Sequence, residues 1–171
     1  MDKILGNLNL VLVIGLVAAL ALIFGTHGGL DPNLVLRWLH VFFGILWIGL
    51  LYYLNLVQVP TMPSIPAELK KGVTGYIAPK VFFFFRYGAL LTVLTGLGIA
   101  FVDGYGHQAL TFSGEGNVNL IGLGMWLALI MAFNVWFIIW PAQQKILGLK
   151  EASDAEKASA APRALAASRT N

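Results

Sequence analysis

The sequence predicts an all-α membrane protein folded as a four-transmembrane-helix bundle, and two observations predict it. First, the 171 residues are 58% hydrophobic and only 11% charged, whereas a soluble domain carries about a quarter charged residues. The apolar excess must therefore face lipid. Second, four apolar stretches are each long enough to cross about 30 Å of hydrocarbon as a helix; they lie near residues 8–25, 34–59, 81–102 and 118–140.

The four stretches and their connections form one predicted domain over residues 1–150, followed by an Ala- and Ser-rich tail over residues 151–171. No small-residue cleavage site follows the first stretch, so we expect an uncleaved helix rather than a secretory signal. The connector 60–80 contains four prolines and is expected to lie along the membrane surface. The tail is either a surface helix that breaks near Pro162 or a disordered segment.

The distribution of basic residues predicts the orientation of the chain. The connections at residues 26–33 and 103–117 contain no Lys or Arg. Most basic residues lie in the connector 60–80 and the tail region: Lys70, Lys71, Lys80, Lys145, Lys150, Lys157, Arg163 and Arg169. Because Lys and Arg favour cytoplasmic loops, we expect both termini in the cytoplasm. The net charge of +3 therefore reflects membrane orientation, and no nucleic-acid partner is expected.

The composition also excludes several kinds of site. The chain has no Cys, which rules out disulfides, thiolate metal sites and the covalent attachment of a c-type haem. The predicted spans contain no Asp or Glu, and the sequence has no phosphate-binding Gly loop, H-E-x-x-H or G-x-S-x-G motif. A self-contained hydrolase or nucleotide enzyme is therefore not expected.

The second predicted span carries a polar stripe. Its members recur at spacings of three or four and so share one helix face: Arg37, His40, Gly44, Trp47, Leu51, Asn55 and Gln58. Lipid cannot satisfy such groups, so this polar face should point into the bundle or towards a partner. Asn134 in the fourth span is a candidate to bond to a polar group on the second.

His40 is the first candidate for a cofactor ligand. Neutral imidazole is a standard axial ligand of haem iron, and a neighbouring Arg37 can pair with a haem propionate. A haem held by two histidines needs His27 or His107, which both lie in the Lys-free connections. Alternatively, His40 only bonds to a neighbouring helix. An unpaired Arg37 deep in lipid would cost at least about 2.5 kcal/mol, which predicts a partner for it or an outward orientation.

The third predicted span has two features of a structural kind. Arg86 follows four consecutive phenylalanines and is expected to anchor the helix at the membrane interface. Gly88, Thr92, Gly96 and Ala100 recur at spacing four, which is typical of a face that packs closely against another helix.

Several motifs resemble the membrane domain of bacterial membrane-bound urate hydroxylases, the urate oxidase N-terminal family. They cover most of the chain: LRWLHVFFGILWIG at 36–49, YYLN at 52–55 and QVP at 58–60 in the second span, RYGA at 86–89 and TG at 95–96 in the third, NVWFIIWP at 134–141 and QQKI at 143–146 in the fourth, and residues 164–171 of the tail. The resemblance reaches only the first half of that domain.

This resemblance implies a redox function in the bacterial cytoplasmic (inner) membrane. Members of the family are thought to oxidise urate and to pass electrons to a fused c-type cytochrome domain, whose Cys residues this chain lacks. We therefore expect a membrane redox module that binds a b-type haem or a quinone and works with a partner cytochrome. The alternative is a cofactor-free accessory subunit packed against other subunits of a respiratory or photosynthetic complex. A third possibility is a urate-oxidising fragment that needs its missing half.

Overall fold

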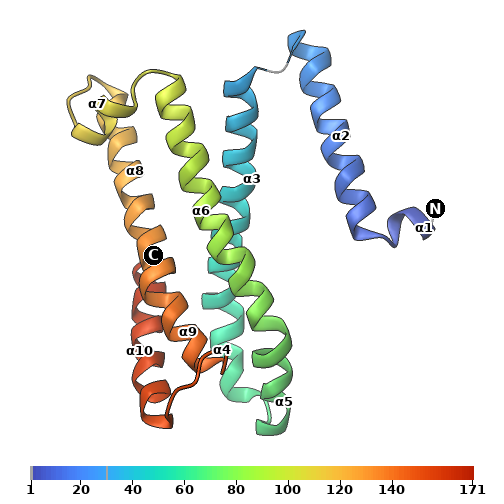
Figure 1. The fold of residues 1–171 in the computed structure, drawn as a ribbon, viewed down its shortest axis with the longest axis vertical. Helices are drawn as coiled ribbons and strands as arrows, with labels where there is room; N and C mark the ends of the chain where they lie inside the picture. The colour runs from blue at the N-terminus through green and yellow to red at the C-terminus, as the bar shows by residue number, and fades with distance from the viewer. Residues whose placement is uncertain (1, 30) are drawn as a thin grey trace.

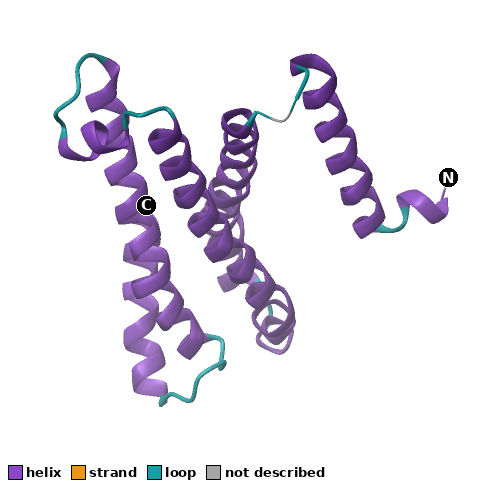
Figure 2. Ribbon diagram, turned by 45° about the horizontal axis from the view of Figure 1, so that its top comes forward, coloured by secondary structure: helices purple, strands orange, loops and turns teal. Residues whose placement is uncertain are grey.

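The computed structural model describes residues 2–29 and 31–171, without the side chains of residues 2, 3 and 27. Every regular element in these ranges is helical, which confirms the predicted all-α class (Figures 1 and 2). Four helical segments are long and apolar enough to cross a membrane: Leu8–Thr26, Pro32–Ser64, Ala67–Val102 and Asn117–Ile146. The last three are longer than the predicted spans.

The first span is α2 (Leu8–His27), which follows the short α1 (Asp2–Leu5). The side chain of Asn7 accepts a hydrogen bond from Leu10 N and caps the helix start, and Gly28 ends it with a left-handed φ of 69°. Figure 1 shows α2 standing apart from the other spans, and none of its apolar window is buried. Within the described part of the chain, α2 therefore meets the bundle only through its connection.

The second span consists of four consecutive segments, and Asp31 and Pro32 begin it as N-cap and first helical residue. In order they are α3 (Pro32–Tyr52), the π-helical η1 (Tyr53–Gln58), α4 (Val59–Thr61) and the 3-10 turn η2 (Met62–Ser64). The third span comprises α5 (Ala67–Gly72), the π-helical η3 (Val73–Ile77) and α6 (Ala78–Val102).

The proline-rich connector therefore differs from the surface segment that we expected. It is almost entirely helical and extends the second and third spans. Pro60, Pro63 and Pro79 each occupy the first turn of a helical segment, and Pro66 is an N-cap. Pro60 and Pro79 lie inside longer continuous helices, and each follows a π-helical segment, whose altered hydrogen-bonding pattern accommodates the missing N–H and the bulk of the ring.

The fourth span is α8 (Asn117–Phe133), the π-helical η4 (Asn134–Ile139) and α9 (Trp140–Ile146), preceded by the short α7 (Gly106–Thr111). The tail forms α10 (Asp154–Thr170), which turns back and lies beside η4 and α9 (Figure 1). The helix continues through Pro162, so the expected break is not there.

The main packing contact joins α3 to α6. A Cβ atom added at Gly88 would lie 3.4 Å from the backbone nitrogen of Trp47, and one at Gly96 would lie 2.9 Å from Cε1 of His40. The small-residue stripe is thus a packing face, as predicted. Below it, the core contains Trp47, Leu51, Phe85, Val135 and Ile139, all nearly inaccessible to solvent.

Three spans are longer than a bilayer requires. At 1.5 Å per residue, segments of 33, 36 and 30 residues measure about 50, 54 and 45 Å, against about 30 Å of hydrocarbon. The bundle must therefore project from the membrane. We refer below to its two ends as the α7 end and the α5 end (Figure 1).

The α3–α6 contact predicts the effect of a larger side chain at Gly88. Gly88→Leu should lower the stability of the bundle by about 1–3 kcal/mol, because overpacking forces the helix backbones apart. Thermal unfolding in detergent measures the loss. Gly15→Leu on α2 is the matched control, since nothing lies within 4 Å of its added Cβ. Equal melting temperatures for the two variants would contradict a close α3–α6 contact.

The start of α10 predicts a pH dependence. The backbone N–H of Ser153, the ammonium of Lys145 and the hydroxyl of Ser153 hold the pKa of Glu156 at about 2, below its ordinary 4.5. Because the pKa of Glu156 is lower in the folded protein, its carboxylate contributes fully to holding α10 against α9 above about pH 4.5. This contribution is lost as the pH falls through about 2. The distribution of distances between spin labels at Ala158→Cys and Phe137→Cys should therefore become broader as the pH falls over that interval.

In this doubly labelled protein, which contains no other Cys, Glu156→Gln should show the broader distribution already at neutral pH. Glu151→Gln is the control, because Glu151 has no hydrogen bond or ion pair among the described residues. A Glu156→Gln distribution identical to that of the parent at neutral pH would contradict this role.

Candidate functional site

A cavity of about 440 Å³ lies between α3, α6 and α8 towards the α7 end of the bundle. This volume falls within the range of about 300–1,000 Å³ that is typical of small-molecule sites. Most of its lining is apolar, from Val41, Leu97, Ile121 and Leu129. Its polar and sulfur-bearing lining comes from Arg37, His40, Thr92, Tyr105 and Met125.

The imidazole of His40 is held by α6. Its Nδ1 lies 2.9 Å from the carbonyl oxygen of Thr92 and 3.2 Å from Oγ1 of Thr95. A carbonyl oxygen only accepts, so Nδ1 carries the proton in the contact with Thr92. In the neutral ring, Nε2 then has a free lone pair. A side chain at residue 96 would clash with the ring, so Gly96 makes room for the imidazole.

Arg37 lies at the rim of the same cavity and has an acidic partner. Its guanidinium is 2.5 Å from Oδ2 of Asp103, and its Nε donates to Oδ1 of Asn33 at 2.6 Å. Asn33 also donates to Asp103. The side chain of Arg37 is 57% exposed, so this pair is worth only about 0.2–1 kcal/mol. The partner expected for Arg37 is therefore Asp103, across the α3–α6 contact.

The other two histidines do not add a second ligand to this arrangement. His107 is exposed on α7 and does not line the cavity. The side chain of His27 lies outside the described residues. Met125 on α8 does line the cavity, and a thioether is a known partner of His on haem iron. Nothing in the sequence distinguishes Met125 from the apolar residues around it, so sequence reasoning missed it.

The polar face of the second span continues towards the α5 end, where it meets α10. Nδ2 of Asn55 donates to the backbone oxygen of Leu51 and, at 2.9 Å, to Oγ of Ser168. Nδ2 of Asn134 donates to Oδ1 of Asn171 at 2.9 Å. Asn134 therefore bonds to the tail helix rather than to the second span. The two asparagines hold the last turn of α10 against the bundle.

Three buried polar atoms of the second span have no hydrogen-bond partner among the described residues. They are Nε1 of Trp47, Oδ1 of Asn55 and Oε1 of Gln58. A buried unsatisfied group costs about 1–3 kcal/mol, and most buried polar groups are paired. These atoms therefore mark places where a bound molecule or water would lower the energy.

Arg86 packs against aromatic side chains of the fourth span, and its role as an anchor at the membrane interface stays a prediction. Its guanidinium carbon lies 3.5 Å from the ring centroid of Trp140 and 5.4 Å from that of Trp136. Its Nε donates to the backbone oxygen of Phe82, and Nε1 of Trp136 donates to the backbone oxygen of Arg86. The cation–π contacts fasten the third span to the fourth.

No protein-family model, curated protein or solved structure matches this chain. In the residues that the structure describes, no group of three or more His, Cys, Asp or Glu side chains could hold a metal ion. Functional inference therefore depends on the geometry of the His40 cavity.

The hydrogen bond from Asn134 to Asn171 predicts that Asn134→Leu lets the end of α10 separate from the bundle. Loss of the hydrogen bond to Asn171, worth about 0.5–1.5 kcal/mol, should raise the open population roughly two- to twelvefold. Limited trypsin digestion measures this as faster cleavage after Arg169. Cleavage after Lys71 is the internal control and should not change. An unchanged rate at Arg169 would show that Asn134 does not hold the helix.

Proposed function

We propose that this protein is an integral membrane redox module, which binds a b-type haem or a quinone in the His40 cavity and passes electrons to a partner cytochrome. One observation carries the proposal. The imidazole of His40 lines a cavity of about 440 Å³ and is anchored through Nδ1 on Thr92. A metal-binding histidine commonly donates its other ring nitrogen to a backbone carbonyl in this way, which fixes its tautomer.

The residues of the cavity fit a non-covalently held haem. His40 would hold the haem iron through a ring nitrogen, and Met125, which also lines the cavity, could hold it through its thioether sulfur. The absence of a side chain at Gly96 keeps the imidazole close to α6, and the apolar lining excludes water. A bound haem would supply a one-electron couple. Arg37 would pair with a haem propionate by sharing its guanidinium with Asp103, to which it is already bonded.

A quinone is the second ligand class that this cavity suits. With Nδ1 protonated on Thr92, Nε2 of His40 can accept a hydrogen bond from the hydroxyl of a reduced quinol. The apolar lining from α6 and α8 suits its ring. The two ligands are distinguished by their spectra, because only haem absorbs strongly in the visible region.

The charge distribution and the motif resemblance extend the proposal to a location. With Lys70, Lys71, Lys80 and the tail on the cytoplasmic side, both termini are cytoplasmic and the His40 cavity lies towards the outer face. The resemblance to the urate hydroxylase membrane domain supports a bacterial inner membrane and a c-type cytochrome as the electron partner.

A second candidate function is that of an accessory subunit in a larger membrane complex. The isolated position of α2 favours it, since none of the apolar window of this span is buried against the described bundle. Such a helix is available to pack against another membrane protein. An accessory subunit needs no cofactor, and the His40–Thr92 contact would then serve only to join α3 to α6.

A reduced-minus-oxidised absorption spectrum of the detergent-purified protein tests the proposal. We expect a b-type haem band that disappears in His40→Ala, because Nε2 of His40 is the proposed iron ligand. His107→Ala is the matched control and should keep the band, since His107 does not line the cavity.

If the spectrum has no haem band, bound quinone should appear on organic extraction of the wild-type protein and be depleted from His40→Ala. Folded protein with neither ligand contradicts the redox proposal. The accessory function would then be supported by comigration with a large complex in mild detergent.

A further inference from the structure

A second cavity, of about 270 Å³, lies at the α5 end of the bundle, separate from the His40 cavity. We propose that this α5-end cavity binds a small phenolic or hydroquinone head group, an apolar ring that carries hydroxyl donors. The inference goes beyond the proposed function and does not depend on the occupant of the His40 cavity, because the two cavities share no lining residue.

The three π-helical segments all contribute to this cavity. Leu54 and Gln58 belong to η1, Thr74 to η3 and Ile139 to η4, and all four line it. A π-helical turn costs hydrogen-bond quality and is found frequently at functional sites. Each of the three segments ends two residues before a proline, whose missing N–H accounts for the wider turn, and side chains from all three meet at this one cavity.

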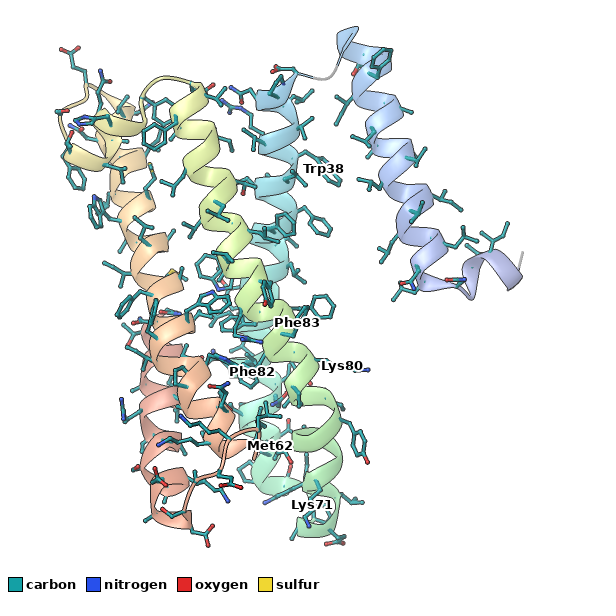
Figure 3. All side chains as sticks on the ribbon, viewed as in Figure 1. Trp38, Met62, Lys71, Lys80, Phe82 and Phe83 are labelled. Carbon is teal, nitrogen blue, oxygen red and sulfur yellow. The ribbon has the colours of Figure 1, made fainter. Side chains whose placement is uncertain are left out.

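The α10 helix forms one wall and leaves the space open. It contributes Ala161, Ala164, Leu165 and Ser168 to the lining. Small side chains at 161 and 164 do not fill the gap towards α6, although larger apolar residues there would bury more surface. Figure 3 shows Phe82 on α6 and Met62 at the end of the second span, which both line the same cavity. The body of the ligand is therefore expected to be apolar.

The polar groups of the cavity indicate hydroxyl donors on the ligand. Oε1 of Gln58 is buried without a hydrogen-bond partner among the described residues, and Gln58 lines the cavity. The hydroxyl of Ser168 already accepts from Asn55. Gln143 also lines the cavity, and no contact of its side chain amide is found in the described part. A hydroquinone can donate to Gln58, while its ring packs against Phe82 and Ile139.

The test is a binding titration of the full-length protein with tetramethylhydroquinone under anaerobic conditions, corrected for partition into empty detergent micelles. Tetramethylbenzene is the ligand control, because it has the same apolar body without hydroxyls. We expect saturable binding of the hydroquinone that is roughly tenfold tighter than that of the hydrocarbon, the effect of about one hydrogen bond.

Two variants locate the binding. Gln58→Leu removes the acceptor and leaves an apolar side chain that is one atom shorter, and it should weaken hydroquinone binding roughly tenfold. Ala164→Phe should fill the cavity and abolish binding of both probes. Gln108→Leu is the matched control, since Gln108 is exposed on α7. The variants are compared in the His40→Ala background, which removes the hydroxyl acceptor of the other cavity. Hydroquinone binding at the α5-end cavity should persist in that background, so failure of the haem proposal leaves this result unaffected.

Four results would overturn the proposal. The first is an absence of saturable binding, and the second is equal affinity for the two probes. The third is a Gln58→Leu variant that becomes more stable but binds the hydroquinone with unchanged affinity. The unpaired amide would then lower the stability of the protein without contacting the ligand. The fourth is loss of binding in His40→Ala alone, which would move the site to the other cavity.

Discussion

The close approach of α3 and α6 is the contact on which the rest of the bundle depends. It is possible because Gly88 and Gly96 have no side chains between the two helix backbones. The same approach brings the ring of His40 within hydrogen-bonding distance of the Thr92 carbonyl. Inside a bilayer such a contact satisfies a group that lipid cannot. With α3 held on one side of α6, α8 on the other side encloses the His40 cavity.

At the α5 end, hydrogen bonds replace glycine contacts as the means of joining helices. Asn55 and Asn134 come from different spans, and each bonds to the last turn or terminal residue of the tail helix. Both lie in π-helical segments, where the wider turn alters which side chains face inward. The tail thus packs against the fourth span, on the side of the bundle away from α2 (Figure 1).

The helical class, the four spans and the α3–α6 packing face could be predicted from the sequence, because hydropathy and small-residue spacing depend on local composition. The inward direction of Trp47 followed from its helical spacing. The helical connector was not predicted because its prolines were taken as helix breaks, whereas Pro60 and Pro79 each follow a π-helical segment inside a continuous helix. The partner of Asn134, the place of Met125 in the lining of the His40 cavity and the π-helical turns could not be predicted. Each depends on which distant segment packs nearby, and the Ala-rich tail gives no strong signal of its contacts.

The excess length of the spans bears on which membranes the protein can occupy. Exposed apolar side chains occur beyond the predicted spans, among them Leu69, Tyr76 and Ile77. A thicker bilayer would therefore cover more of an already apolar surface, and a thinner one would cover less, without helix tilting or distortion of the lipid. Hydrophobic mismatch ordinarily costs fractions of a kcal/mol per ångström and sorts proteins by membrane thickness. Three overlong helices reduce that penalty, so bilayer thickness exerts little sorting force on this bundle.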